Sequence, residues 1–551
     1  MPPPDEPGPP PPTAPERSRT GDSAMGRAVR VFSSLTLVSR IAGLGRDIAT
    51  ARVFGDTAIG SAFMAAFAIP NFFRRLLGEG ALTAAFIPLY TQLDRDDPDA
   101  ARRFGALVVR RLTILTGIIT VLVELALLAV LFLDGRDAER AFSVKLIMVM
   151  FPFMPMVCIA AILGGMLQTH GRFGPSAGMP ILLNLITIAA ALPYALMANP
   201  DRVGAAYVIG IAILVSGVAQ VAWGVRALGP RFAFNASSDG VAETVRTMLR
   251  RFVPVVIGMG TLQINSFFDM LIAMWPNWVG PTIFGFEYPL DDRSNGILGY
   301  SQRLYQFPLG VFGVAVATAI FPMLARVTNS TGEFATTLRR GLRLSLFIGL
   351  PASAGLILVR DPLTFVVYSG GERGFSSDGV ARAAAVLLGY APAIWAFSIN
   401  QVWTRAFYAA GRVRTPMNVA MCMVVVNLVL NLVLIWPFRE AGLAWSTSIC
   451  AIVQCVILAM LSQRLTGVNP MDRSTSVAFG RMMMMTLGMM AVVWGVGEML
   501  PTGASWTGQL VTLIVLTAAG GGSYLALSLA MRAPELGWLL HRDRPERAPV
   551  G

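Results

Sequence analysis

Apolar runs of about 20 residues recur along almost the whole chain, separated by short polar segments that are rich in arginine. A helix needs about 20 apolar residues to cross the hydrocarbon core of a bilayer, so each run predicts a transmembrane helix. Transmembrane barrels show shorter, alternating segments and are excluded. The sequence therefore predicts an all-α polytopic membrane protein with about fourteen spans. They are 28–52, 58–91, 104–133, 142–168, 176–198, 203–226, 247–275, 296–327, 336–359, 380–410, 415–436, 440–463, 476–499 and 508–531.

Positive charge lies mainly on one side of these spans. The loops after even-numbered spans hold most loop arginines, whereas the loops after odd-numbered spans hold more aspartates. The positive-inside rule then places both termini in the cytoplasm. In a soluble protein a net charge of +12 would indicate a nucleic-acid partner. Here the loop bias explains the charge, so we expect no nucleic acid and a multi-pass protein of the bacterial cytoplasmic (inner) membrane.

The chain divides into five segments by composition. Residues 1–24 are proline-rich without a long apolar stretch and predict a disordered cytoplasmic tail, and residues 533–551 predict a second cytoplasmic tail. The spans between them form a first lobe of six helices, a second lobe of six and a final pair. The predicted boundaries are 25–228, 240–465 and 474–532.

An internal repeat supports the two lobes. Pro152 precedes Gly171 by 19 residues, and Pro392 precedes Gly411 by the same 19; both glycines are followed by arginine. A second match joins residues 82–88 to 316–322. The matched spans lie six apart, an even number, so the repeat is parallel. In such transporters the cargo site is expected between the lobes near the bilayer midplane.

Ionisable residues in the first span form the first candidate site. Ser39, Arg40, Arg46 and Asp47 occur in a stretch that is otherwise apolar. Charged groups at bilayer depth cost about 2.5–3.5 kcal/mol each on insertion scales and persist where they face a cavity or a partner. Because Arg46 and Asp47 are adjacent on a helix, we expect them to point in different directions. Snorkelling to water or a structural ion pair is the alternative interpretation.

A second group follows in the next span. Asn71, Arg74 and Arg75 come directly after Pro70, and Arg75 can pair with Glu79 at i, i+4. By the repeat, Arg303 occupies the corresponding region of the second lobe, so arginines from both lobes are predicted to converge. Guanidinium stays charged and matches phosphate oxygens bidentately, so the pattern indicates an anionic, phosphate-bearing cargo.

Four polar residues on three later spans form a possible cation site. Asn427 and Asn431 lie at i, i+4, with Asp269 and Thr447 on neighbouring spans. Their oxygens are suited to a small hard cation, and sodium is the candidate. Asparagines in membrane helices also serve as hydrogen-bonding contacts between helices, and that interpretation stays open.

These motifs resemble the lipid II flippases of the MurJ/MviN family, in the MOP exporter superfamily. The similar segments are 39–47, 51–55, 70–75, 79–81, 86–88, 303–308 and 407–416. The resemblance implies a central cationic cavity with alternating access, and two last helices that form a lipid-facing groove. It also implies that Arg46, Asp47, Arg74 and Arg303 act in the cavity. Arg40, Arg75, Ser39 and Asn71 complete the implied substrate-binding set, and the implied sodium ligands are Asp269, Asn427, Asn431 and Thr447.

The chain departs from the family pattern at Ser61, Ala68 and Gln306, where relatives carry an acidic residue, a lysine and a glutamate. The expected cargo is lipid II, the undecaprenyl-diphosphate disaccharide-pentapeptide, moved by a monomer among membrane lipids without catalysis. Two alternatives keep the fold: an exporter of another polyprenyl-diphosphate-linked glycan, or a multidrug exporter. A membrane enzyme would need paired acids in a loop, and the only candidates are Asp94, Asp96 and Asp97, which lie among arginines in a solvated loop.

Overall fold

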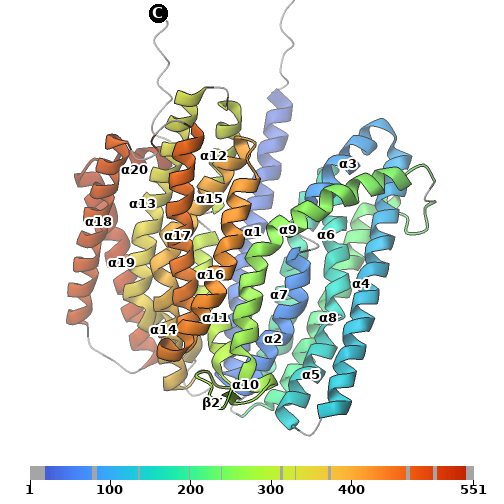
Figure 1. The fold of residues 1–551 in the computed structure, drawn as a ribbon, viewed down its shortest axis with the longest axis horizontal. Coiled ribbons are helices and arrows are strands. Elements are labelled where there is room, and N and C mark those ends of the chain that lie inside the picture. Colours follow the sequence, from blue (N-terminus) through green and yellow to red (C-terminus); the bar gives the residue numbers. More distant parts are fainter. Residues whose placement is uncertain are drawn as a thin grey trace, which may run out of the picture.

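The structure is a computed structural model and consists almost entirely of helices (Figure 1). It describes residues 19–76, 83–134, 137–197, 199–237, 239–310, 314–328, 330–369, 374–466, 469, 472–500 and 505–540. The first half of the chain contains α1 (Arg19–Phe54), α2 (Ala58–Phe73), α3 (Thr83–Asp96), α4 (Pro98–Asp134), α5 (Ala138–Met150), α6 (Phe153–Thr169), α7 (Phe173–Leu196) and α8 (Arg202–Leu228), followed by the 3₁₀ turn η2 (Gly229–Arg231).

The second half runs from α9 to α17. It contains α9 (Ala242–Ala273), α10 (Trp275–Trp278), β1 (Thr282–Ile283), β2 (Phe286–Glu287), α11 (Ser294–Pro308), α12 (Val314–Arg326), α13 (Thr331–Thr364), η4 (Phe365–Ser369), α14 (Ser377–Tyr390), η5 (Ala391–Ala393), α15 (Ile394–Ala409), α16 (Arg414–Phe438) and α17 (Glu440–Thr466). Three helices follow: α18 (Arg473–Met499), α19 (Trp506–Ala530) and α20 (Pro534–Leu539). The strands β1 and β2 form one antiparallel hairpin.

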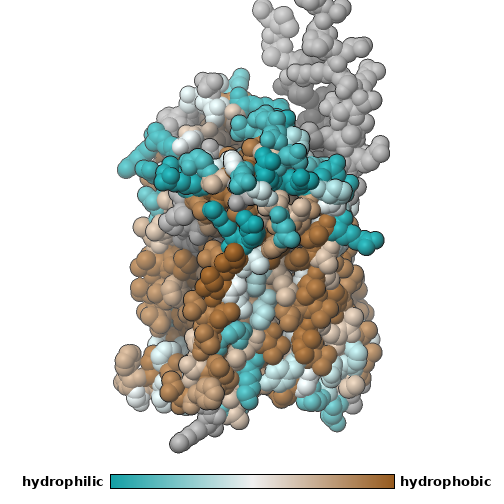
Figure 2. All heavy atoms as spheres, turned by 90° about the vertical axis from the view of Figure 1, so that its right-hand side faces the viewer, coloured by the Kyte–Doolittle hydropathy of each residue, from teal (hydrophilic) through white to brown (hydrophobic). Residues whose placement is uncertain are grey.

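The prediction of a helical membrane protein is confirmed. Among the described residues, ten helices are long and apolar enough to cross a membrane. On the face shown in Figure 2, a broad hydrophobic band crosses the bundle, and hydrophilic residues gather mainly at the upper end and in smaller patches at the lower end. The count of fourteen spans stays a prediction.

Prolines divide two of the predicted spans into paired helices. Pro152 separates α5 from α6, and Pro392 lies in η5 between α14 and α15. A proline ring removes a backbone donor and clashes with the preceding turn, so the helix restarts after it. The predicted spans 58–91 and 296–327 also appear as two helices each, with residues 77–82 and 311–313 outside the described part.

The two halves share local geometry and packing. Gly171 and Gly411 both adopt positive φ, at 70° and 72°. In both places the glycine N–H donates to the carbonyl oxygen three residues earlier, and the N–H of the following arginine donates to the carbonyl oxygen five residues earlier. These two hydrogen bonds end the helix in the same way in both halves. The neighbour pairs α1–α7, α7–α8, α6–α8 and α3–α4 recur as α9–α16, α16–α17, α15–α17 and α12–α13. The lobe boundaries themselves stay predictions.

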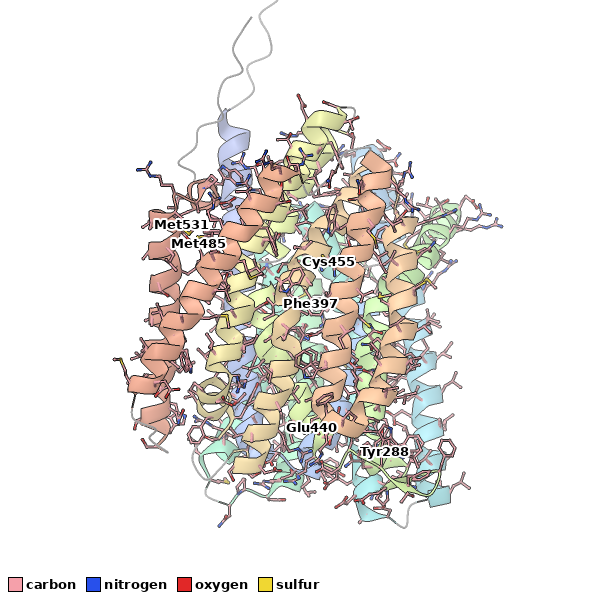
Figure 3. The ribbon with its side chains drawn as sticks, turned by 60° about the vertical axis from the view of Figure 1, so that its left-hand side comes forward. Tyr288, Phe397, Glu440, Cys455, Met485 and Met531 are labelled. Atoms are coloured by element: carbon pink, nitrogen blue, oxygen red, sulfur yellow. The ribbon has the colours of Figure 1, made fainter. Side chains whose placement is uncertain are left out.

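The last helices pack against the second half. Helices α18 and α19 pack on α13 at the edge of the bundle away from the first half (Figure 1). Figure 3 shows Met485 and Met531 on this pair. The short α20 is fixed by Glu535, which is fully buried and pairs with Arg343 at 2.5 Å and with Arg481 at 2.9 Å.

Helices extend into both segments that were predicted as tails. Helix α1 already begins at Arg19, inside the segment predicted as a disordered tail, because no proline follows Pro15 before the first span. The segment 533–551 predicted as a tail contains α20, since its buried Glu535 and the Trp538 ring both contact arginines of α13. Residues 1–18 and 541–551 lie outside the described part.

Candidate functional site

A cavity of about 570 Å³ lies where α1, α2, α6, α7, α8 and α11 face one another. Five arginines line it, and none of the described lining residues is acidic. They are Arg40, Arg46, Arg74, Arg75 and Arg303. Ser39 and Asn71 line the same cavity. The predicted convergence of arginines from both halves is therefore present in the structure.

Asp47 lies behind the lining and joins two of these arginines. Arg46 donates from Nε at 3.0 Å and from Nη2 at 2.7 Å to one oxygen of Asp47. Arg303 from α11 lies with its Nε 3.7 Å from the other oxygen. The expectation that Arg46 and Asp47 point apart was wrong, because the long arginine side chain folds back across its neighbour. The single carboxylate thus holds guanidinium groups of both halves beside the cavity.

The neighbouring helix α7 orients Arg46 further. Arg46 Nη1 donates to the Asn184 amide oxygen at 3.1 Å, and the Asn184 amide donates to the Ser39 carbonyl oxygen at 3.0 Å. The guanidinium also lies over the Phe67 ring, 4.7 Å from its centroid, which is a cation–π contact. A Cβ at Gly43 would lie 3.6 Å from Asn184, so the glycine lets α1 and α7 approach closely.

The α2 arginines are positioned by amides. The Asn71 amide donates to the Phe67 carbonyl at 2.8 Å, and Arg74 Nε donates to the Asn71 oxygen at 3.0 Å. Arg75 donates to Gln263 of α9 at 3.3 Å. The partner predicted for Arg75, Glu79, lies outside the described residues.

Arg40 reaches the second half directly. Its guanidinium lies against Gly310, where a Cβ would collide with it. A smaller cavity of about 90 Å³ adjoins the main one and shares Asn71, Arg75 and Arg303 with it. Ala68 and Gln306, two of the departures from the family pattern, line this smaller cavity.

Several cavity residues were not singled out as site residues from the sequence. Asn184 is one of them, and its amide oxygen accepts a hydrogen bond from Arg46. Gln168 and Ser176 bond to each other at 2.8 Å on the cavity wall, and Gln220 lines it from α8. Neutral amides in long apolar helices were the available signal, because a membrane span rarely carries them without a polar surface to face.

The four predicted cation ligands do meet. Asn431 donates to Asp269 at 2.7 Å and to the Asn427 oxygen at 3.2 Å, and the Asn427 amide approaches Thr447 at 3.4 Å. Ser446, which was not predicted, donates to Asn431. The cluster therefore forms hydrogen bonds between α9, α16 and α17. No group of three or more His, Cys, Asp or Glu side chains that could hold a metal was found in the described part of the chain.

A second polar region lies at the end of the bundle opposite α20, where Figure 3 places Glu440. Asp56, between α1 and α2, accepts from the Ser376 N–H at 2.7 Å and from the Ser376 hydroxyl at 2.6 Å. Arg293 approaches the same carboxylate at 3.5 Å. We call these contacts of Asp56 with Ser376 and Arg293 the seam, because they join the two halves. Next to the seam, the Ser61 hydroxyl accepts the Gly296 N–H at 2.9 Å.

The second half holds a buried ion cluster beside the seam. Arg382 donates to Glu440 at 2.6 Å and, through both terminal nitrogens, to Asp291 at 2.8 Å. Arg439 donates to Asp291 at 2.8 Å as well. Burial opposes ionisation of Asp291, but the hydrogen bonds and charge of Arg382 outweigh it and hold the pKa of that carboxyl well below its ordinary value.

Two related halves around a cationic cavity, enclosed in an apolar helical bundle, define a membrane transporter. A family model described as "Lipid II flippase MurJ" matches residues 50–516. The chain therefore belongs to the lipid II flippase MurJ family, and the resemblance noted in the sequence is confirmed. It is a multi-pass bacterial membrane protein.

Individual relatives agree with this assignment. The chain is 31% identical to a probable lipid II flippase MurJ of Vibrio cholerae over 522 residues, which cover 91% of this chain and 95% of the relative. It is 33% identical to the Rhizobium tropici protein of the same description over 445 residues, covering 77% and 78%.

Solved structures show the same fold. A lipid II flippase MurJ in an inward closed conformation superposes with a TM-score of 0.73 at 22% identity, covering 91% of this chain and 98% of that one. An inward-facing multidrug resistance transporter of the MATE family, in the MOP superfamily, gives a TM-score of 0.62 at 14% identity, covering 80% and 98%.

Proposed function

We propose that this protein moves lipid II, the diphosphate-linked lipid precursor of peptidoglycan, from the inner to the outer leaflet of the cytoplasmic membrane. The observation that carries the proposal is the cavity formed by helices of the first half and Arg303 of the second, with five arginines and no acidic residue in its described lining. Membership of the lipid II flippase MurJ family supports the same cargo. Flipping makes and breaks no covalent bond, so the protein acts as a transporter.

The cavity chemistry suits a diphosphate. Guanidinium forks bind phosphate oxygens bidentately and stay charged in a low-dielectric site. Arg46 is held in place by Asp47, Asn184 and the Phe67 ring, so little side-chain freedom is lost when an anion binds. The side chains of Gln168, Ser176 and Gln220, which also line the cavity, suit the sugar and peptide groups. The polyprenyl tail stays in the hydrocarbon of the bilayer.

The charge of the cavity disfavours the multidrug alternative. The likeness to the MATE transporter shows a shared fold alone. A carrier of organic cations needs carboxylates that face its cargo, and the described lining offers arginines. An exporter of another polyprenyl-diphosphate-linked glycan would use the same arginines, and it is distinguished by the complementation test below.

We propose an orientation with both termini in the cytoplasm. The first turns of α1 and the short α20 lie at the same end of the bundle (Figure 1), next to the arginine-rich loops. The arginine cavity is complete within one chain, so we propose that the monomer is the working unit. Light scattering of the purified protein in detergent tests the second point, since a stable dimer would contradict it.

We further propose that the polar cluster of α9, α16 and α17 holds a sodium ion. Asp269 is buried, and no ion pair was found for it among the described residues. The carboxylate of Asp269 and the side-chain oxygens of Asn427, Asn431 and Thr447 are ligands suited to a small hard cation. Thermal unfolding in sodium against potassium tests this, because only sodium should raise the midpoint, and Asp269→Asn should abolish the difference.

Complementation of a bacterial strain depleted of its own lipid II flippase tests the main proposal. The wild-type chain should restore growth, and Arg46→Ala and Arg303→Ala should fail at equal abundance in the membrane. Arg226→Ala is the matched control, because Arg226 is exposed in the last turn of α8. Failure of the wild-type chain at good abundance would indicate another cargo. Normal growth with both cavity substitutions would rule out the arginine mechanism.

A further inference from the structure

An apolar groove of about 460 Å³ lies outside the central cavity, at the end of the bundle opposite α20. It is bounded by α9, α10, the β1–β2 hairpin and α16. All ten lining residues are aliphatic or aromatic. They are Leu271, Ile272, Trp275, Ile283, Phe284, Phe286, Tyr288, Leu432, Ile435 and Trp436. The volume falls in the range of about 300–1,000 Å³ that is usual for small-molecule sites.

The polar groups at its floor are engaged inside the protein. The Tyr288 hydroxyl donates to the Ile272 carbonyl at 3.0 Å, and the Trp275 indole donates to the Thr282 carbonyl at 3.3 Å. The Trp275 and Tyr288 rings stack 5.8 Å apart. These contacts fix the hairpin over the helices and leave ring faces and aliphatic groups towards the groove. A charged or strongly polar ligand would find no partner there.

The hairpin itself is amphipathic. The cross-strand pair Ile283–Phe286 lines the groove, whereas the neighbouring pair Thr282–Glu287 does not. Successive residues of a strand point to opposite faces, so one face of the hairpin is apolar and the other is polar. Such a division fits an element that lies at a boundary between hydrocarbon and water.

The hairpin tip carries an aromatic residue in an unfavourable place. Phe284 has a φ of 50° and its neighbour Gly285 a φ of 84°, so both central residues of the turn are left-handed. Asparagine, aspartate and glycine are the usual residues of such turns, and a bulky residue there is an outlier that calls for an explanation. The Phe284 side chain is 94% exposed within the chain. A ring in that position gains nothing in water and gains burial in a bilayer.

The groove is continuous with the membrane-facing surface of α16. Leu432 and Trp436 of the groove are about half exposed, and Val429 and Val433 on the same helix are also exposed. Tyrosine and tryptophan concentrate where a membrane protein meets the headgroup region, and Trp275, Trp436 and Tyr288 gather at this end, where Figure 3 shows Tyr288.

We propose that the groove binds one acyl chain of a membrane phospholipid, with the Phe284 tip inserted into the leaflet at this end of the bundle. In the orientation proposed above, that is the outer leaflet. The lipid headgroup stays outside, because no lining residue is charged. The groove is separate from the arginine cavity. A result against lipid binding in the groove therefore leaves the proposed transport function untouched, and a result against transport of lipid II leaves the groove proposal untouched.

A nitroxide at the hairpin tip tests the insertion. Cys422, the exposed cysteine among the described residues, is replaced by serine, and the label is attached at Phe284→Cys. In phosphatidylethanolamine–phosphatidylglycerol vesicles, oxygen should relax this label strongly and a water-soluble nickel complex weakly. Glu287→Cys, on the polar face of the same hairpin, is the matched control and should show the reverse. Equal access of the nickel complex at both positions would overturn the proposal.

Brominated acyl chains test the occupancy of the groove. The emission of Trp275 is obtained as the difference between the wild type and Trp275→Phe, and brominated phospholipids should remove most of it. Leu432→Phe, which narrows the groove, should restore that emission, while quenching of Trp494 on the lipid-facing side of α18 stays unchanged. Unquenched Trp275 would overturn the proposal. Disulfide formation between two copies through Phe284→Cys, without quenching, would instead assign the groove to a second copy.

Discussion

Asp56 offers the most direct test of how the halves are held together. Its carboxylate accepts the Ser376 N–H at 2.7 Å and the Ser376 hydroxyl at 2.6 Å, and it lies 3.5 Å from Arg293. Ser376 is the N-cap of α14, so the carboxylate also lies at the positive end of a helix. A Cβ at Gly379 would collide with Asp56, so the glycine at this position leaves room for the carboxylate. In the alternating-access cycle that the family resemblance implies, these contacts would have to break whenever this end opens.

The substitution Asp56→Asn keeps the shape and removes the charge. Hydrogen bonds to a charged group contribute about 1.5–3 kcal/mol, and neutral ones about half as much. The Arg293 side chain is 36% exposed, so its ion pair adds less than about 1 kcal/mol. Because the amide retains one acceptor for Ser376, we expect the closed seam to lose about 2 kcal/mol. That shifts the equilibrium towards opening by a factor of about thirty.

Labelling of a cavity cysteine measures this shift. Ala161→Cys lines the cavity from α6, and a membrane-impermeant maleimide is added from the side of the seam in the Cys422→Ser background. When opening is fast compared with labelling, the labelling rate follows the open fraction, so Asp56→Asn should label about thirtyfold faster. Asp292→Asn is the charge-matched control. Asp292 lines a pocket together with the seam residues Asp56, Arg293 and Ser376, and no ion pair was found for it among the described residues. Equal labelling rates in all three chains would show that the Asp56 contacts do not hold this end closed.

The remaining predictions concern stability, measured as unfolding midpoints in detergent. Arg382→Met should destabilise the fold by roughly 3–5 kcal/mol, because it leaves the buried Glu440 with only the half-exposed Arg439 at 3.9 Å as a cation. Arg439→Met, at a side chain 46% exposed, should cost less than about 1 kcal/mol, and similar midpoints for the two variants would contradict this. Asp472 caps α18 through the Thr475 N–H at 2.8 Å, so Asp472→Ala should cost about 1 kcal/mol and Asp472→Asn much less. Hydrogen bonds from Thr475 lower the pKa of Asp472. The contribution of the Asp472 carboxylate to stability is therefore full above pH about 4 and is lost as the pH falls through the lowered pKa. An alanine variant whose stability depends on acid pH as the wild type's does would contradict this.

The sequence predicted the helical class and the convergence of the arginines because both follow from spacing. Apolar runs of membrane length predict helices, and the internal repeat relates Arg303 to the region of Arg74. Contacts between distant segments were beyond this reasoning. Gln263 of α9 contacts Arg75, and Asp56 contacts α14, although neither position carries a local pattern. The hairpin at 282–287 was missed because a two-residue strand is too short to show alternation.

Arginine serves two opposite purposes in this chain, and the partners distinguish them. At the end opposite α20, Arg382 and Arg293 face carboxylates, so charge is balanced and the arginines fix the structure. In the cavity, Arg46 and Arg74 also bond to the amides Asn184 and Asn71, which orient the guanidinium groups and carry no charge themselves. Asp47 lies behind the lining and joins Arg46 to Arg303. Five arginines line the cavity, two of them share this one carboxylate, and no described lining residue is acidic. The described lining therefore stays positive, as an anionic cargo requires.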